Sequence, residues 1–196
     1  SHGDNDHSGG LAGLVREIPT EELLLGDPGG AKHWPSSRPC QQGQTWQRNK
    51  INFRVLWPPA GSHQRKSNNY SCVLLLEWGE QKILLTGDIE GDIEARLLAE
   101  GLLPADVTLL VAPHHGSKTS STRAFVAHTR AQAVVFSAGY RNRYRHPHPK
   151  IVERYRDYGT KIYNTGEQGA IIFEWRSADS VPTVERARYR IRRAWY

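Results

Sequence analysis

The pattern of apolar and polar positions predicts strands in the middle of the chain. Residues 51–57 alternate apolar and polar side chains at their start and stop at two prolines, as strands commonly do. Residues 70–78 are mostly apolar, which is typical of a strand covered on both faces. A tight turn at residues 79–80 leads into a returning strand over residues 82–86. We therefore expect a sheet built from hairpins in this region.

Beyond residue 86 the pattern changes to helices that alternate with strands. Ile93, Leu97 and Leu98 form one apolar face of a helix over residues 90–100. Further helices are expected over residues 121–128 and 150–158, and strands over residues 107–112, 133–136, 161–163 and 170–175. Hairpins followed by strand–helix units imply a layered α/β (α+β) fold, and the length of 196 residues suits one domain.

The two ends of the chain are less regular. Residues 8–17 predict a short helix, and residues 23–25 a short buried strand. Residues 27–44 are rich in Pro, Gly, Ser and Gln and predict a long surface loop. From residue 183 to Arg192 the arginines alternate with other residues, which predicts an edge strand with one charged face.

Charge and cysteine content add limited information. The formal net charge of +6 favours anionic partners such as nucleic acid or a membrane surface. No run approaches the roughly 18 apolar residues that a membrane-spanning helix needs. Cys40 and Cys72 do not have the spacing of a metal site, so they are either free thiols or one disulfide.

The strongest chemical signal lies at the start of the chain. His2, Asp4, Asp6 and His7 place four potential metal ligands within six residues, followed by two glycines. Such a density of carboxylates is costly unless cations neutralise it, and imidazole and carboxylate are ligands of zinc, manganese and iron. In an extended loop, positions 2, 4 and 6 point to one side and position 7 to the other. The motif can then serve two ions; the alternative is a polar loop without metal.

Predicted strand ends carry further ligand-type residues. Asp88 follows a buried strand, where it either bridges two ions or caps the next helix. His114 and His115 follow another strand. Adjacent histidines usually point to different sides, so we expect one to bind metal and the other to support a ligand or protonate a leaving group. Lys118 can contact a substrate phosphate.

An arginine- and tyrosine-rich loop follows the strand predicted at residues 133–136. Interleaved arginines and aromatic rings suit contact with phosphates and stacked bases. The alternative is a solvated basic loop. The residues concerned are Tyr140, Arg141, Arg143, Tyr144, Arg145, His146 and His148.

In this order the motifs resemble those of the metallo-β-lactamase superfamily. Its signature is H-x-H-x-D-H, followed by a bridging aspartate and later histidines at strand ends. Residues 2–7 match the signature with Asp4 where most members have histidine. This aspartate, the T-G-D of residues 86–88, the H-H-G-S-K-T-S of residues 114–120 and the N-R-Y-x-H-P-H-P pattern of residues 142–149 together resemble ComEC-type DNA-internalisation competence proteins.

The resemblance implies the C-terminal portion of an αββα sandwich with its site at the edge of two sheets. Because the first strands of the family pattern are missing, we expect a single metallo-β-lactamase-like domain that is incomplete at its N-terminus. The resemblance also implies a longer parent protein in the inner (plasma) membrane, with a membrane channel domain. Its expected partner is DNA, single-stranded in particular, taken up during natural transformation, and no small organic cofactor is expected.

The expected activity is that of a metal-dependent DNA phosphodiesterase, a nuclease. Two divalent ions would activate water and stabilise the leaving oxygen. Manganese is favoured over zinc because Asp4 makes the site harder, with zinc and magnesium as the alternatives. The alternatives are a hydrolase of another ester, such as a phosphorylcholine ester or a lactone, and a non-catalytic module that guides DNA.

Each candidate residue has an expected role. His2 and Asp4 would hold one ion, Asp6 and His7 the other, with Asp88 between them. The full set of expected metal ligands is His2, Asp4, Asp6, His7, Asp88, His114 and His115. Catalytic roles fall to Asp6, His115 and His146, and substrate binding to Lys118, Arg141, Arg143, Arg145 and His148.

Overall fold

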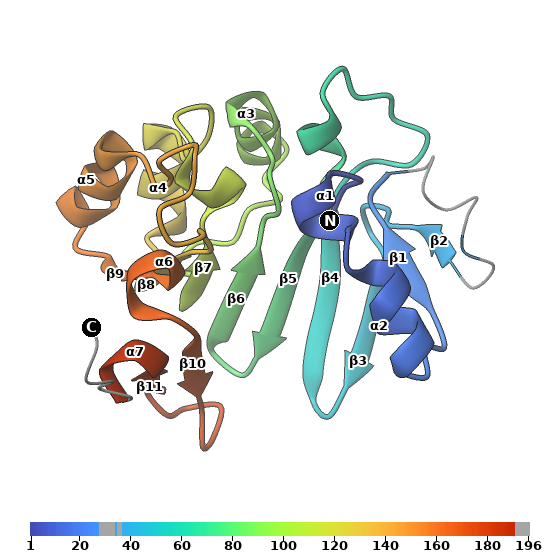
Figure 1. Ribbon diagram of the computed structural model, residues 1–196. Helices are drawn as coiled ribbons and strands as arrows, with labels where there is room; N and C mark the ends of the chain where they lie inside the picture. The colour runs from blue at the N-terminus through green and yellow to red at the C-terminus, as the bar shows by residue number, and fades with distance from the viewer. Residues whose placement is uncertain (28–33, 35–36, 191–196) are drawn as a thin grey trace.

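A computed structural model describes residues 1–27, 34 and 37–190, and its centre is one seven-stranded sheet (Figure 1). The strand order is β3-β4-β5-β6-β7-β8-β9. The strands are β3 Thr45–Arg48, β4 Ile51–Trp57, β5 Val73–Trp78, β6 Gln81–Leu85, β7 Leu109–Val111, β8 Ala133–Phe136 and β9 Lys161–Asn164. Neighbours from β3 to β6 are antiparallel, and neighbours from β6 to β9 are parallel.

The change from antiparallel to parallel pairing follows from the connections. A tight turn joins β5 to β6, whereas helices α3 Gly91–Ala99, α4 Arg123–Thr129 and α5 Pro149–Asp157 connect the parallel strands. Parallel strands place their carboxyl ends at one edge of the sheet. The loops that follow β6, β7 and β8 therefore meet at that edge. No helix in the described part of the chain is long and apolar enough to cross a bilayer.

Helices α3, α4 and α5 cover one face of the sheet (Figure 1), and the core lies between them and the strands. Leu75, Leu84, Leu110 and Val134 are aligned in register across β5 to β8, and each is fully buried. Burying a side chain of this size contributes roughly 1.5–3 kcal/mol. This apolar row explains why the mostly apolar runs of the sequence became central strands.

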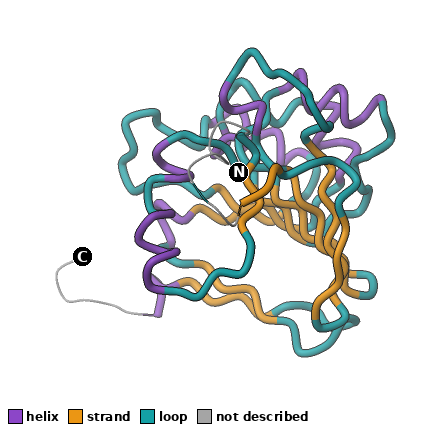
Figure 2. Tube along the Cα trace, turned by 90° about the vertical axis from the view of Figure 1, so that its right-hand side faces the viewer, coloured by secondary structure: helices purple, strands orange, loops and turns teal. Residues whose placement is uncertain are grey.

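The opposite face carries half-buried apolar side chains, including Leu74, Leu76 and Leu85. Smaller elements lie beside this sheet, among them α1 Asn5–Ser8 and α2 Leu11–Glu17 near the N-terminus and the hairpin of β10 Ile171–Glu174 with β11 Thr183–Arg186. Figure 2 shows the curved sheet from its side, with the helix layer above the strands. The layered α/β prediction is confirmed.

A strand appears within the predicted loop of residues 27–44. This strand, β2 Ser37–Pro39, pairs in parallel with β1 Leu23–Leu25, which was expected as a strand, and the Cys40 amide donates to the Leu25 carbonyl at 2.8 Å. The polar composition of β2 hides it from a local pattern, because its order comes from contacts with a distant segment. Residues 28–33 and 35–36 of the predicted loop lie outside the described residues.

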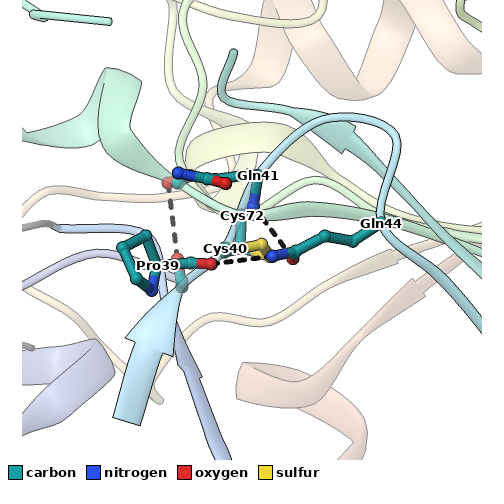
Figure 3. The surroundings of a disulfide bond; sticks show 7 residues. Pro39, Cys40, Gln41, Gln44 and Cys72 are labelled. Carbon is teal, nitrogen blue, oxygen red and sulfur yellow. Dashed lines mark hydrogen bonds between the residues drawn. A yellow bond between two sulfur atoms is a disulfide. The ribbon is translucent and has the colours of Figure 1, made fainter. Parts of the chain in front are cut away.

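Cys40 and Cys72 form a disulfide, which decides between the two alternatives left open by the sequence. Figure 3 shows the bond beside the Pro39 carbonyl, which accepts from the Gln44 side-chain amide at 3.0 Å. The Gln41 backbone amide donates to the same Gln44 side chain at 3.0 Å. The bond thus ties β2 to the start of β5.

The prediction of an edge strand from residue 183 to Arg192 was wrong beyond residue 186. β11 ends at Arg186, and residues Ala187–Arg190 form the short helix α7. The Arg188 guanidinium donates to the carbonyls of Gly166 and Glu167, and these long-range contacts override the local alternation. Residues 191–196 lie outside the described residues.

Candidate metal centre

The N-terminal motif bends into a helix rather than staying extended. The backbone amides of His7 and Ser8 donate to the Asp4 carbonyl at 3.0 and 2.9 Å, and α1 spans Asn5–Ser8. The expected extended geometry is therefore wrong. The bend nevertheless places His2 next to Asp4, with 3.4 Å between Nε2 and Oδ2, and Asp6 next to His7, with 3.8 Å between Oδ2 and Nε2.

Four side chains converge at the carboxyl edge of the parallel strands. Asp6, His7, Asp88 and His115 each offer one ligand atom, and these atoms lie within 4.8 Å of one another. His7 Nε2 lies 3.2 Å from Asp88 Oδ1, and His115 Nε2 lies 3.4 Å from Asp88 Oδ2. His115 Nε2 is also 3.3 Å from Asp6 Oδ2. The sequence predicted all four as ligands, and the fold brings them together.

Asp88 is fixed by the loop that follows β6. Its backbone amide donates to Ser71 Oγ at 2.8 Å, and the His114 amide donates to the Gly87 carbonyl at 3.0 Å. Gly87 has φ +54°, and a Cβ there would lie 2.7 Å from the Ser71 side chain, so glycine is required. Burial opposes ionisation of Asp88, but hydrogen bonds with His115 and His7 outweigh it and hold its pKa far below the usual range.

The tautomer of His115 follows from its second ring nitrogen. Nδ1 lies 2.7 Å from the Ser137 carbonyl oxygen, which can only accept, so Nδ1 carries the hydrogen. A neutral ring with its hydrogen on Nδ1 has a free lone pair on Nε2, which is the form that binds metal. A hydrogen bond to Asp88 requires a hydrogen on Nε2 as well, so this contact favours the protonated ring and raises the pKa of His115.

His2 supplies the clearest test of whether these residues fit a metal ion. Its ring is buried, and Nε2 has no hydrogen-bond partner in the described part of the chain. Nδ1 lies 3.1 Å from Ser71 Oγ, and burial lowers the pKa of His2. A buried ring nitrogen without a partner, beside the Asp4 carboxylate, fits a cation that would complete its bonding.

His114 lies at the margin of the cluster. Its Nε2 is 3.8 Å from Asp88 Oδ2 and 3.3 Å from the Asn68 side-chain nitrogen, and its Nδ1 is 3.0 Å from Thr119 Oγ1.

Ser67 also contacts an expected metal ligand, because its hydroxyl donates to Asp4 Oδ1 at 2.6 Å. The sequence assigned no function to Ser67 or Ser71 because both lie in or next to a polar linker without a ligand pattern.

The arginine- and tyrosine-rich segment of residues 140–148, called the basic loop below, lies beside the site. The His146 ring lies edge-on to His114, with centroids 5.9 Å apart, and His146 Nδ1 is buried without a partner in the described residues. Asn142 holds this loop: its side chain donates to the His146 carbonyl at 2.7 Å and accepts from the His146 amide at 2.8 Å. Arg141, Arg143 and Arg145 are exposed.

Two expected substrate-binding residues do not belong to the four-residue metal cluster. His148 is the N-cap of α5, because its Nδ1 accepts from the Lys150 amide at 3.2 Å. Lys118 is exposed in the loop after β7.

Solved structures share the fold at low sequence identity. Igni18, a metallo hydrolase from Ignicoccus hospitalis, matches 83% of the chain and 72% of its own length, with a TM-score of 0.52 and 11% identity. CmlA, a diiron β-hydroxylase from Streptomyces venezuelae, matches 84% of the chain and 42% of its own length, with a TM-score of 0.56 and 15% identity. Fold and cluster together define a protein of the metallo-β-lactamase fold with a His/Asp site suited to metal.

Three proteins are similar in sequence to most of this chain. Recombination protein 2 of Haemophilus influenzae is 33% identical over 87% of the chain, and competence protein ComA of Neisseria gonorrhoeae is 35% identical over 88%. YcaI of Escherichia coli is 36% identical over 86%. The chain is homologous to one segment of each of these proteins, and it spans 21–24% of the length of the three relatives. No protein-family model matches it.

Proposed function

We propose that the chain is a metal-dependent phosphodiesterase that cleaves DNA during DNA uptake. The observation that carries this proposal is the convergence of Asp6, His7, Asp88 and His115 within 4.8 Å beside an arginine-rich loop. The names of the competence relatives support a role in DNA uptake. The much greater length of those relatives supports a parent protein held in the inner membrane, with a channel domain as the partner of this one.

Two divalent metal ions fit the donor set. Asp6, His7 and His115 would hold one ion, His2 and Asp4 the other, and Asp88 would lie between them. Carboxylates make up half of these six groups, which favours manganese over zinc, and the imidazoles of the other half favour manganese over magnesium. When bound, the ions would supply an activated water and stabilise the leaving oxygen.

The side chains around the cluster would bind and orient the substrate. Lys118, Arg141 and Arg143 would hold phosphates of the strand on either side of the bond that breaks.

His146 would contribute as a neutral ring. Burial, and then the neighbouring His114 and His115, lower the pKa of His146. His146 would therefore act as a neutral ring that donates a hydrogen bond to a phosphate oxygen.

Cleavage of labelled single- and double-stranded DNA tests this function. We would assay the chain with manganese, magnesium or zinc, beside Asp6→Ala and Asp88→Ala. Glu80→Gln is the matched control, because Glu80 is exposed in the β5–β6 turn at the other end of the strands. Metal-dependent cleavage that both site variants lose and Glu80→Gln keeps is the expected result.

Two outcomes would overturn the proposal. If the folded, metal-loaded chain leaves DNA intact but hydrolyses a phosphorylcholine ester or a lactone, the substrate is another ester. If the chain binds DNA but no metal, it is a module that guides DNA.

A further inference from the structure

A large cavity lies next to the metal cluster and is not needed to hold the ions. Its volume is about 810 Å³, and it is lined by the basic loop, α5 and the segment around Gly166. His146 belongs both to its wall and to the edge of the cluster, because its ring faces His114 at 5.9 Å. A group bound in the cavity would therefore be separated from the metal cluster by the His146 and His114 side chains.

The lining combines positive charge with apolar surface. Arg141, Arg145 and Arg156 face the cavity against one acidic side chain, Glu167. Pro147, Val152 and Ile162 supply apolar surface. A lining that combines arginines with apolar side chains suits a ligand with a negative phosphate and a flat, weakly polar ring.

Two exposed tyrosines stand in the basic loop: one lies in the cavity lining, and the other lies outside it but stacks on His146, which lines it. Tyr140 lines the cavity and is 61% exposed, and Tyr144 is 63% exposed. The Tyr144 ring stacks on His146, with an interplanar angle of 17° and centroids 5.8 Å apart. Guanidinium groups lie over both rings, Arg141 at 5.2 Å over Tyr140 and Arg143 at 4.6 Å over Tyr144. Exposed aromatic rings flanked by arginines are the surface on which unpaired bases stack.

Hydrogen bonds within the loop hold it in this conformation. Arg141 and Arg145 have φ values of +52° and +55°, a region that non-glycine residues rarely adopt. The Asn142 side chain donates to the carbonyls of Gly139 and His146, at 3.0 and 2.7 Å, and so ties both ends of the turn together. A preformed loop reduces the entropy lost when a flexible strand binds.

We propose that this cavity binds an unpaired nucleotide of the substrate strand, adjacent to the phosphate that is cleaved. This inference rests on the proposed function and deepens it. Bases in a duplex are already paired and stacked, so only an unpaired base is free to lie against Tyr140 and the apolar side chains of the cavity lining. The cavity thus gives the site a preference for single-stranded DNA.

Binding without metal separates base recognition from cleavage. The whole chain, treated with a chelator, is titrated with a labelled oligothymidylate and with an abasic oligomer of the same length and charge. Tyr140→Leu combined with Tyr144→Leu should weaken oligothymidylate binding about 5- to 100-fold. The abasic oligomer should bind both proteins alike. Tyr158→Leu is the matched control, because Tyr158 is exposed at the end of α5 and belongs neither to the basic loop nor to the cavity lining.

The outcomes distinguish the cavity from the metal site. If wild type binds the two oligomers equally, or the double variant binds like Tyr158→Leu, the nucleotide site is refuted even where metal-dependent cleavage of DNA persists. If wild type neither binds nor cleaves DNA, both the proposed function and this inference fail. Circular dichroism confirms that each variant is folded, and all three tyrosines are exposed.

Discussion

The Nε2 atoms of His7 and His115 lie 3.2 Å apart, although 108 residues separate them in the chain. His115 Nδ1 already donates to the Ser137 carbonyl, so two ring nitrogens and the Asp88 carboxylate converge on one small space. Such an arrangement is stabilised by a cation, because the cation satisfies lone pairs that otherwise oppose each other.

Divalent metal should therefore stabilise the folded chain. At a concentration about 100-fold above Kd, binding adds about 2.7 kcal/mol, which corresponds to a rise in Tm of about 5–10 °C. Asp88→Asn should lose most of this rise, whereas Asp106→Asn, at an exposed residue paired with Arg130, should keep it. Thermal unfolding with manganese or with chelator measures the effect. An equal rise in both variants would contradict the assignment.

Ser71 should act as a positioning residue for the metal ligands. Its hydroxyl oxygen accepts from the Asp88 amide at 2.8 Å and lies 3.1 Å from His2 Nδ1, so it holds both residues. Groups that orient ligands in this way typically change metal affinity about 10- to 100-fold. We expect Ser71→Ala to weaken manganese binding in calorimetric titration by that factor, and Ser62→Ala to leave it unchanged. Unaltered affinity in Ser71→Ala would show that its contacts are only structural.

Leu110 should be one of the most sensitive core positions. It is fully buried in the row between Leu84 and Val134. Leu110→Ala should lower the free energy of unfolding by about 2–5 kcal/mol, as measured by urea denaturation. Val111→Ala, on the half-buried face of the same strand, should cost clearly less. Equal losses would mean that both faces of β7 are equally packed.

Reducing the Cys40–Cys72 disulfide should destabilise the domain. The bond closes a segment of sequence separation 32, for which the loss is roughly 2–4 kcal/mol. Urea denaturation with and without reductant measures the change. The double variant Cys40→Ser with Cys72→Ser should have the free energy of unfolding of the reduced protein, and reductant should not change it. Coincident unfolding curves for oxidised and reduced wild type would refute this expectation.

The sequence predicted strands well where burial dictates the pattern. β4 and β8 match the expected residues 51–57 and 133–136 because apolar side chains there fill the core. β2 and α7 were missed because their order comes from distant contacts, such as that of Arg188 with the Gly166 carbonyl.

The residues of the site also fall into those that the local sequence pattern reveals and those whose role depends on contacts with distant residues. Ligand-type residues at strand ends are visible in the sequence, and so Asp88 and His115 could be named in advance. Which of His114 and His115 enters the cluster depends on the Ser137 carbonyl, 22 residues further along the chain. No local pattern carries that information, and the same holds for Ser67 and Ser71.

The bond between Cys40 and Cys72 also bears on how the protein is made. Two cysteine thiols form a disulfide where oxidants reach the newly made chain, and they remain reduced where glutathione and thioredoxin act. Chain produced in a reducing cytosol would carry two thiols, and its β2 segment would be free to separate from the start of β5, beside Ser71. The compartment in which a preparation matures therefore decides which covalent form of the protein is studied.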